Sequence, residues 1–174
     1  MSTAIVYGPA GASDNSYVTL AAADEWFAAS ARAGQWSGFS MDERTNALIE
    51  ATRNIESLGG PKDSMTARRA RFGGEPAYFT QGLHFPRGHD IDSGGHFIVP
   101  HGVRDAVCEQ ALYLLQDNAA PALEDHSANQ AAGIASKSVD GYSVTYRPGT
   151  TPYGIGLRAW NIIRDYVSMT HGTC

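Results

Sequence analysis

Residues 100–117, with the sequence PHGVRDAVCEQALYLLQD, form the stretch whose apolar side chains keep a helical period from end to end. Pro100 suits the first position of a helix, because its missing N–H costs nothing there and its fixed φ matches the turn. Asn118 and Pro121 end the pattern. The segment predicts a buried helix around which the core is built, with an apolar face of Val103, Ala106, Val107, Ala111, Leu114 and Leu115.

Three more helices are predicted from local start and stop signals. The first follows Thr19, a residue that can cap a helix, and runs to about residue 33, where Gly34 ends it. The second covers residues 41–58, because Ser40 and Glu43 have the spacing of a capping box and Gly-Gly-Pro at 59–61 terminates it. The last covers residues 157–167, with an apolar face of Leu157, Trp160, Ile163 and Val167.

A β-hairpin is predicted between the third and fourth of these helices in chain order. Residues 136–139 and 142–146 flank Asp140-Gly141, a pair suited to the positive φ angles of a tight turn. Tyr142, Val144 and Tyr146 alternate with polar residues, which gives one apolar face. Because an isolated hairpin is marginal in water, we expect this face to be covered by the rest of the domain or by a neighbouring subunit.

The fold class predicted from these elements is mainly α: a small bundle of about four helices with a long irregular loop and a C-terminal β-hairpin arm. At 174 residues the chain is most simply a single domain, 1–174. We divide it into a flexible N-terminus at 1–16, a helical core at 17–118 that includes the loop 61–99, and a segment 119–174 with the hairpin arm and the last helix.

Composition excludes several classes of protein. A net charge of −5 argues against a broad phosphate-binding surface, which needs clustered Lys and Arg. Cys108 lies in the predicted central helix and Cys174 is the last residue, so no disulfide framework is expected. No apolar run approaches the ~20 residues that span a bilayer, and no membrane partner is expected.

Potential metal ligands are concentrated between residues 84 and 101, and imidazole and carboxylate groups suit zinc or iron. Their spacing matches no known motif, and the calcium-like start at Asp90 lacks the later bidentate glutamate. We therefore predict no metal, no cofactor and no catalytic residue, and keep a metal-dependent enzyme as a minor alternative. The ligands considered are His84, His89, Asp90, Asp92, His96 and His101.

Two sets of residues could contact nucleic acid. Arg68, Arg69 and Arg71 lie in a polar loop, where they could bind DNA or an acidic partner, although such a loop is more often a solvated surface. Aromatic side chains can stack on bases, although aromatics at helical spacing are more often part of a core. The second set is Trp26, Trp36, Tyr113 and Trp160.

Several short motifs, taken in order, resemble a bacteriophage family, the small head-tail connector (adaptor) proteins. Some members of this family are described as DnaT-like single-strand DNA-binding proteins. The matching segments cover most of the chain, and they look like packing and turn positions rather than a catalytic signature. They are SYVTL at 16–20, AD at 23–24 with WF at 26–27, the helix at 43–55, QGLHFPR at 81–87, VP at 99–100 with the helix at 103–115, and the hairpin at 137–146.

The resemblance implies a structural protein of the virion. Such adaptors form a ring, commonly of twelve copies, beneath the portal protein, extend the DNA channel and dock the next neck or tail component. Double-stranded DNA would pass without specific binding, and the protein would be made in the bacterial cytoplasm and reside at the head-tail interface. The candidate subunit or portal contacts are Tyr142, Val144, Tyr146, Arg68, Arg69 and Arg71. The competing class is a single-stranded DNA-binding protein, which would retain DNA with a steep salt dependence.

Overall fold

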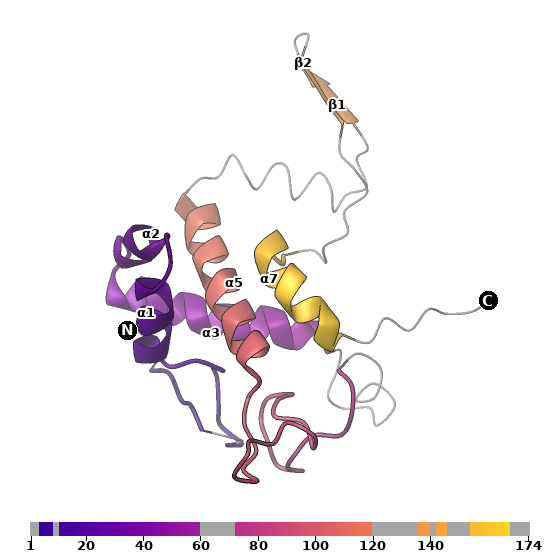
Figure 1. Ribbon diagram of the computed structural model, residues 1–174. Helices are drawn as coiled ribbons and strands as arrows, with labels where there is room; N and C mark the ends of the chain where they lie inside the picture. The colour runs from indigo at the N-terminus through magenta and orange to yellow at the C-terminus, as the bar shows by residue number, and fades with distance from the viewer. Residues whose placement is uncertain are drawn as a thin grey trace, which may run out of the picture.

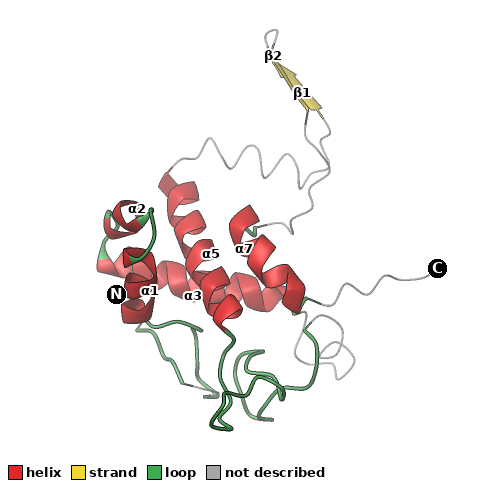
Figure 2. Cartoon of the chain, viewed as in Figure 1, coloured by secondary structure: helices red, strands yellow, loops and turns green. Residues whose placement is uncertain are grey.

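The computed structural model describes residues 4–8, 11–59, 72–119, 136–139, 142–145 and 154–167. Figures 1 and 2 show α5 crossing α3, with α7 beside α5 and with α1 and α2 together at one side. The mainly helical fold class is confirmed, with five α-helices in the described residues where about four were predicted. The helices are α1 (Leu20–Ala28), α2 (Ala33–Ser37), α3 (Met41–Leu58), α5 (His101–Ala119) and α7 (Leu157–Ile163), and the 3₁₀ turn η2 (Arg164–Tyr166) continues α7.

Helix α5 is the centre of the fold, as its sequence predicts, and packs against both α3 and α7. It begins at His101, one residue later than predicted. Pro100 precedes the helix as its capping residue, and its carbonyl oxygen accepts from Arg104 N at 3.2 Å. The buried face is wider than the predicted stripe, since Cys108, Gln110 and Leu112 are buried as well. Leu114, predicted as a core residue, is only half-buried. A helix covered on several sides needs apolar residues beyond a single stripe.

The capping box predicted for α3 is confirmed. Ser40 Oγ accepts from Glu43 N at 3.3 Å, and a Glu43 carboxylate oxygen accepts from Ser40 N at 2.8 Å. Two amides that have no partner within the helix are satisfied in this way. The buried face of α3 includes Leu48, Thr52 and Ile55.

The first predicted helix is wrong in its extent. It ends at Ala28, and α2 follows as a separate short helix that contains Gly34, the residue predicted to end the first one. The chain turns back because the Trp36 ring stacks on Phe27, with centroids 4.4 Å apart, and its Nε1 donates to Asp24 at 2.7 Å. This tertiary contact interrupts a segment that the local pattern reads as one helix.

Helix α7 also ends earlier than predicted. Regular α-helix stops at Ile163, the 3₁₀ turn follows, and Val167 forms an isolated antiparallel bridge with Phe72. Phe72 is 1% exposed, so this bridge ties the end of the described C-terminal segment to the core.

Residues 72–100 contain isolated bridges but no helix or longer strand. The buried Arg87 side chain holds this segment together by donating to the carbonyl oxygens of Phe72, Gly73 and His84, each at 3.1 Å. The loop predicted over 61–99 falls partly outside the described residues, so as a whole it stays a prediction.

Strands β1 (Ser136–Val139) and β2 (Tyr142–Thr145) pair antiparallel, with Val139 opposite Tyr142. The turn between them, their side chains and the covering of the apolar face lie outside the described residues, so the hairpin arm stays a prediction. The division of the chain at residues 16 and 118 is likewise untested.

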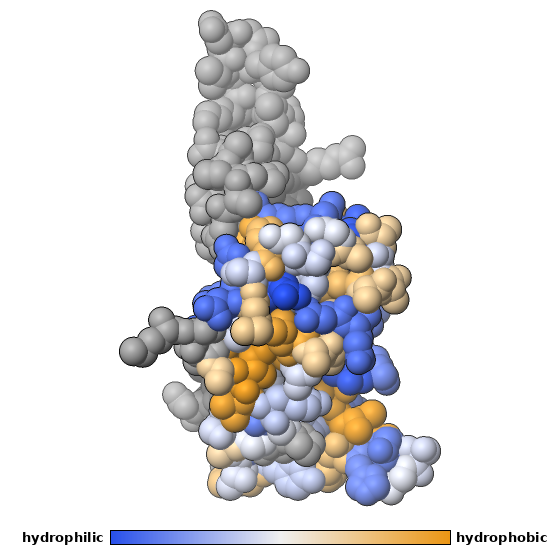
Figure 3. All heavy atoms as spheres, turned by 90° about the vertical axis from the view of Figure 1, so that its left-hand side faces the viewer, coloured by the Kyte–Doolittle hydropathy of each residue, from blue (hydrophilic) through white to orange (hydrophobic). Residues whose placement is uncertain are grey.

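On the face that carries α1 and α2, a band of apolar residues separates the hydrophilic ones (Figure 3). No helix in the described residues is both long and apolar enough to cross a membrane.

Candidate nucleic-acid interface

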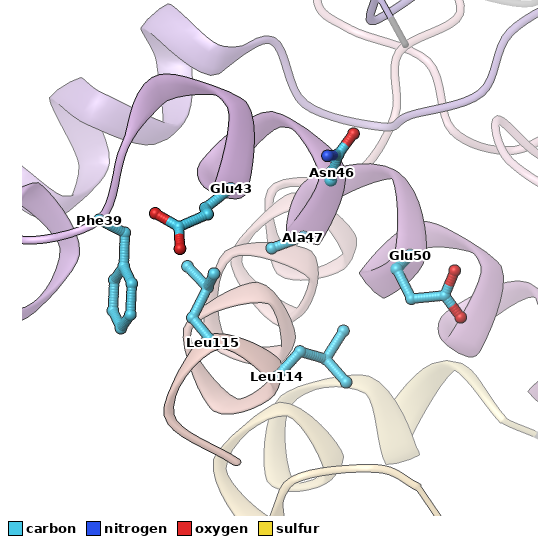
Figure 4. A pocket seen from close by; sticks show the side chains of 7 residues that line it. All are labelled: Phe39, Glu43, Asn46, Ala47, Glu50, Leu114 and Leu115. Carbon is cyan, nitrogen blue, oxygen red and sulfur yellow. The ribbon is translucent and has the colours of Figure 1, made fainter. Parts of the chain in front are cut away.

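Three grooves on the described part of the chain differ in charge. The first, between α3 and α5, measures about 450 Å³ and has two glutamates and no cation in its lining (Figure 4). The second lies between α2, α5 and α7, measures about 450 Å³ and has two arginines against one glutamate. The third, beside α3 and residues 14–15, measures about 400 Å³ and has Asp14 and Glu56 against Arg53. Only the second of these three has a net positive lining, which DNA phosphates require.

We call the second groove the α2–α7 groove. Pockets of this size commonly hold small ligands or a fragment of a larger one. Its lining residues are Arg32, Gln35, Glu109, Tyr113, Gln116, Gly156, Leu157, Arg158 and Ala159.

An ion pair neutralises the acidic residue of the α2–α7 groove. Arg32 donates from both terminal nitrogens to the Glu109 carboxylate, with Nη1 to Oε2 at 2.6 Å. Glu109 is 8% exposed, so the pair is shielded from solvent and the two-pronged geometry is well suited to a charge-assisted contact. Arg158 is exposed and forms no ion pair with any other described residue. Among the described residues of the groove, Arg158 is therefore the cation that is available to an anionic ligand.

Buried hydrogen bonds fix the wall that carries Arg158. Gln110 of α5 is fully buried, donates to Gly154 O at 2.7 Å and accepts from Gly156 N at 2.8 Å. A Cβ at Gly156 would lie 2.8 Å from the ring of Tyr113, so glycine permits the close approach of the two segments. These contacts hold the start of α7 against α5 and set the position of Leu157 and Arg158.

The polar and aromatic groups of the α2–α7 groove suit a nucleobase. Gln116 Nε2 donates to Gln35 Oε1 at 3.1 Å, and both residues are exposed. Amides offer donors and acceptors to the edges of bases, and aromatic rings offer a stacking surface. The half-buried Tyr113 supplies such a ring.

The other aromatics predicted as stacking candidates belong to the core. Trp36 and Trp160 are 2% and 5% exposed, and Trp26 packs edge-on against Phe27 with centroids 4.8 Å apart. Tyr113 alone of the four lines a groove described above.

Sequence reasoning missed the exposed Phe79 and Tyr78. Phe79 is 90% exposed, and Tyr78 is 47% exposed beside the Phe97 ring at 5.2 Å. Their position in a segment without helical period was the signal that could have identified them, because aromatics outside a periodic stripe have no predicted place in the core.

The predicted interaction residues lie largely outside what the structure describes. Arg68, Arg69, Arg71 and Tyr146 are outside the described residues, and Tyr142 and Val144 are placed only as members of β2. The structure nevertheless describes the residues on either side of the segment 60–71. A Cβ at Gly59 would lie 2.7 Å from the Phe72 ring, so the two flanking residues are in close contact. The segment 61–71 carries four cations, Lys62 and the three arginines, against one acid, Asp63.

The histidine-rich segment does not form a metal site among the described residues, where no group of three or more His, Cys, Asp or Glu side chains is placed to hold an ion. His84 is buried, whereas His89 and His96 lie on the surface near Asp90 and Asp92, at 3.7 and 3.5 Å. Asp92 caps a turn by accepting from Gly94 N at 2.8 Å. Asp92 therefore stabilises a turn in the loop.

Cys108 is buried as expected, and burial raises the pKa of its thiol to about 12. A thiol that is protonated at neutral pH is a poor nucleophile and a poor metal ligand.

Comparison with known proteins identifies one family. The sequence model of a family described as "Putative DnaT-like ssDNA binding protein" matches residues 3–170. Neither a curated protein nor a solved structure matches the chain.

This match corrects the function expected from the resemblance. The head-tail connector role is wrong, and so are the phage, virion and portal associations derived from it, because the matching family points to single-stranded DNA binding, the competing class. Since the match extends over nearly all of the 174 residues, the chain belongs to the DnaT-like ssDNA binding protein family.

Proposed function

We propose that this protein binds single-stranded DNA and has no catalytic activity of its own. The observation that carries the proposal is the family match over residues 3–170. The positive lining of the α2–α7 groove supports it, because the other two grooves carry more acidic than basic residues.

The α2–α7 groove is proposed as a contact for one or two nucleotides. Arg158 would meet a phosphate, and Tyr113 would pack against a base or sugar. The exposed amides of Gln35 and Gln116 would contact the base edge that duplex pairing otherwise occupies. Such contacts favour single strands over duplex, because the bases of a duplex are already paired and stacked.

Arg68, Arg69 and Arg71 are proposed as additional phosphate contacts. They stand in the most cationic segment of a chain whose net charge is −5. DNA would therefore be attracted by this cluster of arginines and not by the charge of the whole molecule. The contact of Gly59 with Phe72 supports this proposal, since it places the two residues that flank the segment 60–71 side by side on the core.

The test is fluorescence anisotropy with a labelled oligothymidylate and with a duplex of equal length. We expect the single strand to bind more tightly than the duplex. The Arg158→Glu variant should have roughly tenfold lower affinity for the single strand at low salt. The matched control is Arg164→Glu, which reverses an exposed charge outside the groove. Equal binding of single strand and duplex, or equal losses in the two variants, would contradict the proposed site.

The hairpin residues Tyr142, Val144 and Tyr146 stay proposed as a contact with a second copy of the chain. The support is the alternation of apolar and polar residues in this strand, which leaves one face to be covered. Light scattering of wild type and of a Tyr142→Ser/Val144→Ser variant tests it, with a loss of oligomer expected for the variant.

A further inference from the structure

The α3–α5 groove has an apolar floor formed by residues from two helices and the segment before α3. Figure 4 shows Leu115 and Leu114 of α5 facing Ala47 of α3, with the Phe39 ring at one end and Asn46 directed away. Leu114 and Phe39 are only half-buried, although both pack against the core. An open space of about 450 Å³ lies above these apolar residues and forms the groove.

Two carboxylates flank this floor. Glu43 and Glu50 are seven residues apart on α3, which is about two turns, or roughly 10.5 Å along the helix axis. Figure 4 shows them on the same helix at separate positions along the groove. Both residues are exposed, so a ligand can reach them.

The Glu43 carboxylate is held in place. One of its oxygens accepts from Ser40 N at 2.8 Å and from Ser40 Oγ at 2.7 Å. These hydrogen bonds lower the pKa of Glu43, so it is charged at neutral pH. Glu50 pairs with Arg53 at 3.1 Å, but an exposed pair of this kind is weak and readily exchanged.

This arrangement excludes DNA and selects for a cation. The two carboxylates repel phosphates, and that of Glu43 is held in place, so the groove does not suit the DNA contact proposed for the α2–α7 groove. An apolar strip with two acids about two turns apart along its α3 side complements an amphipathic helix that has basic residues beside its apolar ones.

We propose that the α3–α5 groove docks a basic amphipathic helix of a partner protein. The helix presents Lys or Arg at two positions seven residues apart, which pair with Glu43 and Glu50. Apolar side chains at the intervening third or fourth position contact Leu114 and Leu115. The protein then holds DNA and a protein partner on different surfaces, so the two can be bound at the same time.

The experiment is a selection of displayed helical peptides of about 18 residues on the full-length protein. Peptides that also bind a Glu43→Gln/Glu50→Gln variant are removed. Glutamine at position 43 preserves the capping box, so the variant keeps the start of α3. The matched control is Glu25→Gln/Asp165→Asn, which removes the same charge from exposed residues elsewhere.

We expect enriched peptides to carry two basic residues seven apart with apolar residues between them. A synthetic copy should bind wild type and the control equally and the groove variant roughly tenfold more weakly. Affinity for oligothymidylate should change equally in the two variants, which keeps this result separate from the DNA-binding proposal.

Several results would overturn the proposal. They are the absence of enriched peptides, enrichment without the basic pair, and equal weakening in the groove variant and the control. Self-association that only the groove variant abolishes would also overturn it, because the occupant would then be a second copy of this chain.

Discussion

At the scale of single residues, α5 separates the side chains that hold the core from those that line grooves. Leu112 is 1% exposed, whereas Leu114 is half-buried and lines the α3–α5 groove. The sequence pattern placed Leu114 in the core and passed over Leu112, because a single stripe was assumed for a helix that is covered on several sides.

We expect Leu112→Ala to lower the free energy of unfolding by about 2–5 kcal/mol, since it leaves a cavity in a packed core. Leu114→Ala should cost clearly less, because solvent already reaches its site. Urea denaturation of both variants measures the difference. Equal losses would mean that the two leucines are equally buried in solution.

The Tyr17 hydroxyl is buried between α3 and the loop. It donates to Glu56 and accepts from Phe85 N at 3.0 Å. Burial raises the pKa of Tyr17 well above its ordinary value of 10.0, and the Glu56 carboxylate raises it further. The folded protein therefore keeps this proton at a pH where the unfolded chain releases it.

We expect the free energy of unfolding to fall as the pH rises above about 10, because the unfolded state then binds fewer protons. Tyr17→Phe should lose about 1–3 kcal/mol at neutral pH and show a shallower decline above about pH 10. Urea denaturation between about pH 8 and 11 measures both effects. Tyr166→Phe is a comparison, since the pKa of Tyr166 is also raised by burial and its removal should likewise make the decline shallower. An unchanged decline in Tyr17→Phe would contradict the assignment.

At the scale of elements, the sequence predicts the boundary of a helix correctly where residues next to that boundary determine it. The start of α3 depends on Ser40 and Glu43, which are three residues apart, so the sequence was sufficient. The break between α1 and α2 depends on Trp36 folding back onto Phe27, and the end of α7 on the bridge from Val167 to Phe72. Such tertiary contacts override propensity and cannot be read from a periodic pattern.

Arg87 organises the segment 72–100, although the sequence places it only as the last residue of the motif at 81–87 and predicts no role for its side chain. Its guanidinium is buried and donates to several backbone carbonyls, including those of Phe72, Gly73 and His84. Burial also lowers the pKa of Arg87, but the group stays charged at neutral pH.

We expect Arg87→Met to cost about 3 kcal/mol or more, because several buried carbonyls lose their donor at once. Hydrogen exchange should accelerate at residues 73–77 and 84–88 and stay unchanged in the α1 helix. Exchange that accelerates uniformly would show that Arg87 supports the whole core rather than this segment.

At the scale of the whole molecule, the candidate site was only partly predictable. The arginines at 68, 69 and 71 stand out by composition, since they are close together in a chain with a net charge of −5. The α2–α7 groove does not stand out, because Arg32 before α2, Glu109 of α5 and Arg158 of α7 are far apart in the sequence. Their meeting depends on the packing of α5 against α7 and on the buried Gln110, which no local pattern encodes.

The salt dependence of DNA binding tests how this charge is distributed. Each phosphate neutralised on a single strand adds about −0.7 to the slope of log K against log salt. We expect Arg68→Ala/Arg69→Ala/Arg71→Ala to make the slope shallower by about 2, and Arg158→Ala by about 0.7. The control removes three other arginines, Arg53, Arg104 and Arg164, and should leave the slope near its wild-type value.

The slope is more informative than the affinity alone, because a change in net charge alters long-range attraction for every variant in the same direction. Anisotropy titrations between about 50 and 200 mM salt measure it. If the control flattens the slope as much as the arginine-segment variant, DNA is attracted by the overall charge of the molecule. A difference confined to residues 68–71 and 158 would instead mean that a protein acidic as a whole holds its ligand through two local cationic contacts.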